Sequence, residues 1–238
     1  MIPMNGETNM SDERKFFVEK EVLDSGVKII FPVIEGMDNT KVSEEWLAYR
    51  KSELHRLYEQ YKDLDVHGDE VLEGFNILHD HTGVKRRKNI PASENLIRLL
   101  KKNGDMYFIN QAVDIYNLIS LETKLALGAH DLDHTEGNVT LRFTDGTERF
   151  VPLGQSEPVP VAAHEYSYCD DANEVLCRLE IRQVNKTAVK EDTKNAFYIV
   201  QGNEYTSYED LEKAAERIIE TTLKYCGGKG RIVVPEVI

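Results

Sequence analysis

The densest cluster of side chains that could do chemistry lies in residues 128–134, GAHDLDH. His130, Asp131 and Asp133 bring together imidazole and carboxylate groups, which bind metals or transfer protons. Gly128 precedes His130 and Asp131, and a predicted turn and strand follow them. The segment therefore offers no pair of metal ligands at helical i, i+4 spacing. We therefore predict no tightly bound metal. Two interpretations stay open: a polar turn held by aspartate hydrogen bonds, or a site that moves protons.

A second set of charged residues lies in residues 177–183, CRLEIRQ, which we predict to be a strand. Side chains alternate along a strand, so Arg178, Glu180 and Arg182 are expected on one face. They could form a ladder of ion pairs. Alternatively they line a pocket, where an arginine fork would bind a carboxylate or phosphate.

A basic segment stands out in an acidic chain. The 238 residues carry a net charge of −13 and a pI of about 5.0, which argues against indiscriminate nucleic-acid binding. Residues 85–102 nevertheless contain Lys85, Arg86, Arg87 and Lys88, followed by three more basic residues and one glutamate. This segment is either a solvated surface or a local contact for RNA phosphates.

Other functional classes have no support in the sequence. The chain lacks GxSxG, a phosphate-binding P-loop, GxGxxG and CxxC. We expect no cofactor. Cys169, Cys177 and Cys226 are an odd, sparse set that fits a reducing cytoplasm. No apolar run approaches the roughly 18 residues of a membrane span, and the N-terminus has no apolar signal core, so we expect no membrane association.

Helices are expected mainly in the first half of the chain and strands in the second, which favours an α+β fold with a mixed or antiparallel sheet packed by helices. Ser207 and Asp210 occupy capping-box positions at the start of the last helix. The expected helices cover 43–64, 69–81, 93–102 and 207–226, with a further apolar stretch at 109–121. The expected strands are 15–23 and 27–36 as a hairpin, then 138–143, 147–153, 166–170, 174–181, 196–202 and 231–238.

The chain resembles the B3/B4 domain of the bacterial phenylalanyl-tRNA synthetase beta chain, and most of all stand-alone proteins that carry this domain. The resemblance covers roughly residues 85–205. It rests on four ordered segments: PASENLIRLLKKNG, INQAVDIYNLISLE, GAHDLDHTEGNVTLRF and EVLCRLEIRQVNKTAVKEDTKN. In the synthetase this domain is an editing site that hydrolyses tyrosine wrongly attached to the phenylalanine tRNA.

The resemblance also assigns positions. Asn117 matches the family asparagine, whereas the family threonine before it is Tyr116. The family histidine falls on Gly128, and the glutamate that recognises the tyrosine hydroxyl falls on Ile199. The glycine-rich pocket wall falls on RLEIRQV, so a charged segment stands where glycines leave room for a side chain.

Two functions follow as hypotheses. The first is a free-standing protein that binds tRNA and hydrolyses mischarged aminoacyl-tRNA, without synthetase activity. Water would be positioned by Asn117, with His130 or Asp131 as base. Asp133, Arg178, Glu180 and Arg182 would bind substrate, and residues 85–88 would contact RNA.

The second is a non-catalytic module that binds an amino-acid-like or anionic small molecule through its arginines. For either function we expect a flexible tail at 1–14, an N-terminal hairpin and helices at 15–84 in the same globule, the B3/B4-like domain at 85–205, and a completing helix and strand at 206–238.

Overall fold

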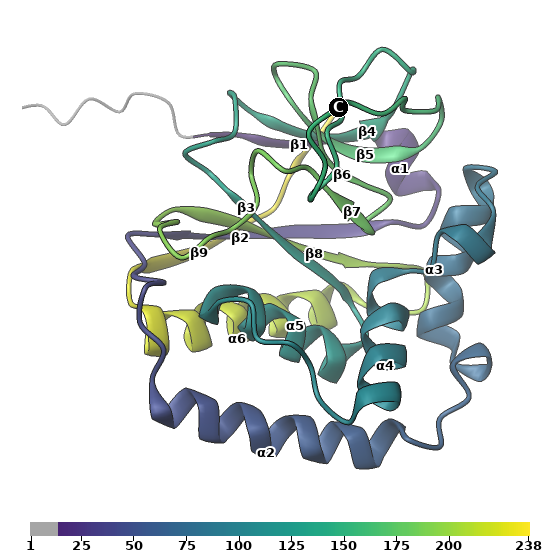
Figure 1. The fold of residues 1–238 in the computed structure, drawn as a ribbon. Coiled ribbons are helices and arrows are strands. Elements are labelled where there is room, and N and C mark those ends of the chain that lie inside the picture. Colours follow the sequence, from purple (N-terminus) through teal and green to yellow (C-terminus); the bar gives the residue numbers. More distant parts are fainter. Residues whose placement is uncertain (1–13) are drawn as a thin grey trace, which may run out of the picture.

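The computed structural model describes residues 14–238, and at its centre lies an antiparallel sheet in the strand order β3-β8-β2-β9 (Figure 1). The predicted tail at 1–14 lies, apart from its last residue, outside the described residues. Successive side chains of β2 enter two different cores, with Ile30 and Ile34 on one face and Ile29 and Phe31 on the other. Both faces of this sheet are therefore covered. Its strands are β3 (Ala126–Asp131), β8 (Ala196–Gly202), β2 (Lys28–Glu35) and β9 (Lys229–Val233).

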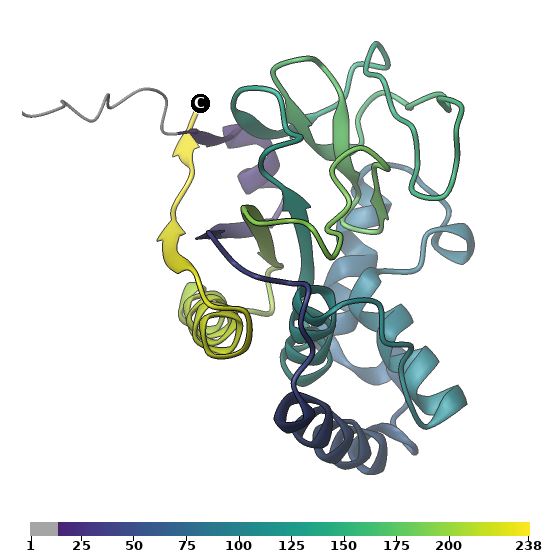
Figure 2. The same ribbon diagram turned by 60° about the vertical axis from the view of Figure 1, so that its left-hand side comes forward.

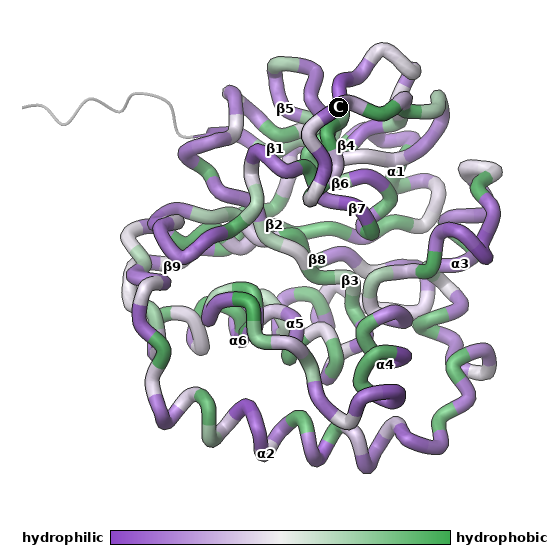
Figure 3. The backbone as a smooth tube through the Cα atoms, viewed as in Figure 1, coloured by the Kyte–Doolittle hydropathy of each residue, from purple (hydrophilic) through white to green (hydrophobic). Residues whose placement is uncertain are grey.

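A layer of helices covers one face of the central sheet (Figure 2). Helices α5 and α6 pack directly on the strands, and α2 lies outside them against α4 and α5. Apolar segments, green in Figure 3, run through β2, β3 and β8. The helices are α1 (Lys20–Asp24), α2 (Glu44–Tyr61), α3 (Glu70–His81), α4 (Ala92–Asn103), α5 (Gln111–Thr123) and α6 (Tyr208–Cys226), with short 3₁₀ turns η1 (Val66–Gly68) and η2 (Arg86–Lys88).

Side-chain caps fix where most of these helices begin. Ser43 accepts a hydrogen bond from the N–H of Trp46 at 3.0 Å, and Asp69 caps α3 in the same way. Ser207 and Asp210 form a reciprocal capping box at the start of α6. The helices predicted at 43–64, 69–81, 93–102 and 207–226 are confirmed.

A second, mixed sheet covers the other face of the central sheet, in the order β10-β1-β4-β5-β6-β7. β1 runs parallel to β4 and β10, and the other pairs are antiparallel. Aromatic rings fill the space between the sheets; Phe16 stacks on Phe31 with centroids 4.6 Å apart. The predicted α+β class is confirmed. The strands are β1 (Phe16–Val18), β4 (Val139–Phe143), β5 (Tyr166–Asp170), β6 (Val175–Arg178), β7 (Arg182–Gln183) and β10 (Glu236–Val237).

The predicted hairpin at 15–36 is wrong. Helix α1 separates β1 from β2, and the two strands lie in different sheets, stacked face to face rather than side by side. The predicted single strand at 231–238 is likewise two strands, one in each sheet. Pro235 lies between them, and proline has no N–H with which to continue a ladder.

The predicted strand at 147–153 is also absent. This part of the chain makes only isolated bridges, at Arg149 and Pro152, within the long connection from β4 to β5. Its backbone makes isolated hydrogen bonds to neighbouring segments and forms no ladder. The connection lies beside the central sheet, where residues 152–155 line a pocket described below.

Candidate functional site

A pocket of about 560 Å³ opens where an edge of the central sheet meets the β6–β7 hairpin. Its walls are the first turn of α4, the middle of α5, the start of β3, and residues 152–155 of the connection after β4. The volume lies in the range of small-molecule sites. Polar groups are frequent in the lining, namely Asn95, Tyr116, Asn117, Gln155, Glu180, Arg182 and Gln183.

Three of the predicted site residues are brought together here: Asn117, Glu180 and Arg182. Asn117 is half-buried on α5. Arg182 is exposed, and its side chain forms no ion pair with any residue that the structure describes. The pocket therefore offers one uncompensated cation and one carboxamide from the predicted set.

The pocket wall is a tight hairpin and not the single strand predicted at 174–181. The chain reverses at Leu179 and Glu180, both with φ of 50°, and the N–H of Ile181 donates to the carbonyl of Arg178 at 3.1 Å. Two successive residues at positive φ match a type I′ turn, which usually takes Asn-Gly. Leucine and glutamate are strained in this conformation, so the surrounding contacts must hold it in place.

Glu180 is the residue that these contacts hold. Its Oε1 accepts from His79 Nε2 at 2.8 Å, and its Oε2 accepts from the hydroxyl of Tyr166. The other ring nitrogen of His79 lies 3.1 Å from the carbonyl oxygen of Asn89. Both of these partners of His79 are acceptors, so the imidazole carries both protons and is a cation. Although Glu180 is part of the pocket lining, both of its carboxylate oxygens are thus engaged, and we assign it to positioning the turn.

The electrostatics of this buried group agree with the geometry. Burial alone would lower the pKa of His79, but the charge of Glu180 and its hydrogen bond outweigh burial, so the pKa is raised. Burial and the same carboxylate raise the pKa of Tyr166, which keeps its hydroxyl proton and donates it. The result is a neutral ion pair with one added hydrogen bond.

Arg178 lies apart from the pocket. It faces Arg182 across the hairpin as its strand partner, but its guanidinium forms a two-pronged ion pair with Glu165, with Nη2 at 2.6 Å. Both partners are largely buried. The structure therefore gives Arg178 an intramolecular carboxylate.

The GAHDLDH segment does not line the pocket either. The His130 ring is fully buried against Phe197, with Nδ1 2.7 Å from Thr187 Oγ1 and Nε2 without a partner among the described residues. Burial lowers its pKa to about 3. Asp131 accepts hydrogen bonds from the N–H groups of the turn that follows, and Asp133 accepts from an asparagine side chain. This geometry is that of a polar turn.

β3 forms the edge of the central sheet at the pocket. On its outer side, the N–H of Asp131 donates to the carbonyl of Thr187, and Gln183 Nε2 donates to the carbonyl of Ala129 at 3.3 Å. Backbone groups alternate in direction along an antiparallel strand, so the N–H and C=O of Leu127 point to this outer side as well. Leu127 also lines the pocket, so its main-chain donor and acceptor lie at the edge of the sheet that borders the pocket.

Gln183 lies in the segment that the resemblance assigns to the pocket wall, but it was not among the predicted site residues. A Cβ placed on Gly128 would lie 3.2 Å from Gln183 Nε2, so this carboxamide occupies the space beside residue 128. Gly128 is the position where the resemblance places the family histidine. The sequence shows that residue 128 has no side chain. It does not show that the carboxamide of Gln183, 55 positions later, lies in the space beside this glycine.

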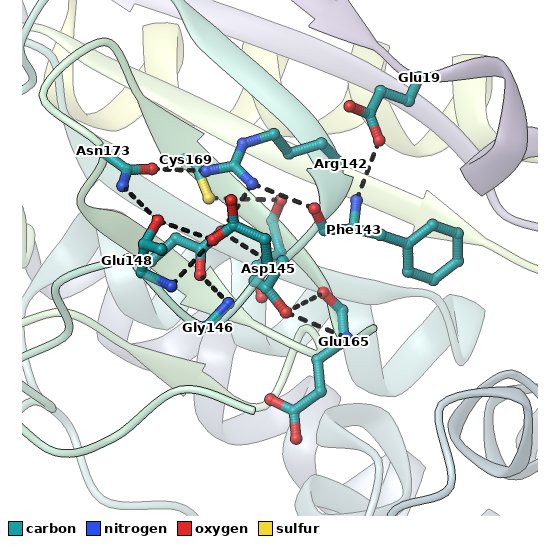
Figure 4. Close-up of polar contacts among 12 residues, drawn as sticks. Glu19, Arg142, Phe143, Asp145, Gly146, Glu148, Glu165, Cys169 and Asn173 are labelled. Atoms are coloured by element: carbon teal, nitrogen blue, oxygen red, sulfur yellow. Dashed lines mark hydrogen bonds and ion pairs between the residues drawn. The ribbon is translucent and has the colours of Figure 1, made fainter. Parts of the chain in front are cut away.

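A buried pair of charges anchors the connection that supplies the pocket wall (Figure 4). Arg142 Nη1 lies 2.6 Å from Glu148 Oε1, and the N–H groups of Asp145 and Gly146 donate to the same carboxylate at 3.0 Å. Burial alone would raise the pKa of Glu148, but these hydrogen bonds outweigh it and lower the pKa. These bonds hold the start of the connection whose residues 152–155 line the pocket.

The basic segment borders the pocket. Lys85, Arg86, Arg87 and Lys88 are all exposed around η2, directly before the pocket-lining Ile90. Arg86 is held by Asp80 and Glu73 on α3, whereas the other three form no ion pair with a described residue.

The described part of the chain contains no cluster of three or more His, Cys, Asp or Glu side chains arranged to hold a metal ion. Within the same residues, no helix combines the length and the apolar character that crossing a membrane requires.

Comparison with known proteins supports the resemblance. The model of the B3/4 domain family matches residues 81–227. A search of curated proteins finds no match. Among solved structures, an N-terminal fragment of the phenylalanyl-tRNA synthetase beta-subunit from Pyrococcus horikoshii is similar over 95% of this chain, with a TM-score of 0.52 and 16% identity. This chain covers 52% of that fragment, about half its length.

The structural match shows a shared fold, and the family model covers the pocket walls from α4 to the β6–β7 hairpin. Both findings confirm the relationship proposed from the four sequence segments. The chain belongs to the B3/4 domain family.

Proposed function

We propose that this chain binds aminoacyl-tRNA and holds the aminoacyl ester at the RNA 3′ end in the 560 Å³ pocket. One observation carries the proposal: a polar pocket in a B3/4 fold lies directly beside an exposed basic segment. The similar solved structure belongs to a phenylalanyl-tRNA synthetase subunit, which supports tRNA as the class of partner. Local basic groups provide phosphate contacts even though the chain as a whole is acidic.

The lining suits the polar parts of an aminoacyl ester. The main-chain N–H of Leu127 can donate to the ester carbonyl, and the side-chain amides of Asn117 and Gln183 can bind the amino group or the ribose hydroxyls. Arg182 supplies a positive charge for the terminal phosphate. A free amino acid has the amino group but lacks the ribose hydroxyls and the terminal phosphate, so it would use only some of these contacts.

The lining favours binding over rapid hydrolysis. Glu180 is the one carboxylate in the pocket lining that the structure describes, and both of its oxygens are engaged. His130 and Asp131 lie outside the lining, so neither reaches a water molecule there. Without a free general base, which typically contributes 10²- to 10⁴-fold, we expect ester cleavage to be slow.

The test measures binding and deacylation of a panel of aminoacyl-tRNAs by the purified chain. We expect at least one aminoacyl-tRNA to bind more tightly than the same tRNA uncharged, with cleavage slow on the timescale of binding. Asn117→Ala should weaken that binding about tenfold, the equivalent of about 1.4 kcal/mol. Asn103→Ala, at the end of α4 and outside the pocket lining, is the matched control. Equal affinity for charged and uncharged tRNA across the panel would refute the proposal.

A second function, binding of a small carboxylate or phosphate without RNA, is favoured by Arg182. This cation lines the pocket and has no ion-pair partner among the described residues. A ligand at a hundred times its Kd should add about 2.7 kcal/mol to the free energy of unfolding. A thermal-shift screen with amino acids and phosphates tests this function, with Arg182→Ala expected to abolish any shift and Lys51→Ala, exposed on α2, expected to retain it.

A further inference from the structure

A second cleft, of about 230 Å³, lies beside the pocket and is lined by His67, Asn76, Arg86, Arg87, Glu94 and Arg98. Ile90 lines both the pocket and this cleft, so the two are neighbours with this residue between them. The cleft lies between α3 and α4, with η2 at its border.

Among the described residues that line the cleft, Glu94 is the one carboxylate, and it already has hydrogen-bond partners. Glu94 is buried and accepts from Arg98 Nε at 2.7 Å and from Asn76 Nδ2 at 3.1 Å. Arg98 is thereby fixed along the cleft, and its Nη2 lies 3.5 Å from His67 Nε2. Glu94 therefore orients the Arg98 guanidinium, and the charges of the two side chains compensate each other.

The basic groups at the border are less completely neutralised. Arg86 is bound by Asp80 and Glu73, which lie outside the cleft lining. Arg87 lines the cleft. Arg87, Lys85 and Lys88 are exposed and form no ion pair with a described residue. After the ion pairs of this segment are counted, positive charge remains at the border of the cleft.

We propose that this cleft binds a phosphodiester of the RNA strand whose 3′ end occupies the pocket. Arg87 is the phosphate ligand, Arg98 is a second donor held in place by Glu94, and Ile90 separates the phosphate from the ester. A guanidinium fits phosphate oxygens with two parallel hydrogen bonds, which an ammonium group cannot do. The inference rests on the proposed function and adds the subsite that sets the direction of the strand.

The test compares Arg87→Ala and Arg87→Lys with the control Lys51→Ala, using uncharged tRNA at several salt concentrations. For single strands, each lost phosphate contact should reduce the slope of log K against log salt by about 0.7. We expect this reduction in Arg87→Ala. Arg87→Lys should keep the slope, because the charge remains, but should bind more weakly. An unchanged slope and affinity in Arg87→Ala would overturn the cleft assignment.

A second ligand separates the cleft from the pocket. A non-hydrolysable aminoacyl-adenosine without a phosphate should bind wild type and Arg87→Ala equally. If it binds neither while the salt slope still falls in Arg87→Ala, the pocket function fails and the cleft stands. If inorganic phosphate saturates the cleft and tRNA does not bind at all, the cleft is a free-phosphate site and the RNA proposal fails.

Discussion

At the residue scale, the buried group of His79, Glu180 and Tyr166 decides how the pocket wall is held. A strained turn of two non-glycine residues persists because two side chains from separate elements, His79 on α3 and Tyr166 on β5, hydrogen-bond to the Glu180 carboxylate of the turn. The charged pair is fully enclosed, so each partner depends on the other for compensation.

We predict that Glu180→Gln lowers the free energy of unfolding by about 3 kcal/mol, because it leaves the His79 cation buried without its carboxylate. Tyr166→Phe removes one neutral donor and should cost about 1 kcal/mol. Urea denaturation of both variants measures the difference. Equal losses in the two variants would show that the charge of the pair is unimportant.

The same histidine should make stability depend on pH. Its folded pKa is raised, so its stabilising contribution is complete below the unfolded value of about 6.5 and is lost as pH rises through the folded value. Glu180 and Tyr166 are the titratable groups in contact with it. The free energy of unfolding should fall as pH rises above about 6.5, and His79→Gln should flatten this fall. An unaltered pH slope in that variant would contradict the assignment.

At the element scale, the edge of β3 and the β6–β7 hairpin share one space, beside Gly128 and Gln183. A Cβ at 128 would lie 3.2 Å from Gln183 Nε2, so the carboxamide would have to shift by a few tenths of an ångström. Gly128→Ala should therefore cost more stability in wild type than in a Gln183→Ala background, with a coupling energy of about 0.5–3 kcal/mol in a double-mutant cycle. Strictly additive effects would mean that the two positions do not compete.

At this scale, the sequence predicts features that depend on residues close together in the chain and misses those that depend on distant ones. The starts of α2, α3 and α6 depend on cap residues within one turn, Ser43, Asp69 and Ser207, and all three were predictable. The turn at 179–180 depends on His79, a hundred positions away, and its residue types suggest a strand. Asn117 and Arg182 were placed in the site through the resemblance and the residue pattern, whereas the burial of His130 follows from sheet stacking that no local pattern encodes.

At the scale of the whole molecule, two hydrophobic cores share one sheet. β2 and β8 contribute alternate side chains to the two cores, so unfolding of one core would disrupt the strands that form the other. We predict a single cooperative unfolding transition.

The chain provides natural probes for this prediction. Trp46 is the sole tryptophan and lies in the helix-side core, whereas Cys169 and Cys177 lie between the sheets. In a Cys226→Ser variant, tryptophan fluorescence and thiol accessibility should change at the same urea concentration. Separate midpoints would show that the two layers unfold independently.

The outward-facing main chain of β3 determines which substitutions at residue 127 the pocket can tolerate during evolution. The N–H and C=O of Leu127 belong to the main chain, so almost any residue at that position supplies the same donor and acceptor. Recognition through these groups is robust to mutation, while the side chains around them are free to drift. A ligand bound through these groups would keep this contact while the neighbouring side chains change, and proline at 127 is the substitution that would remove the donor.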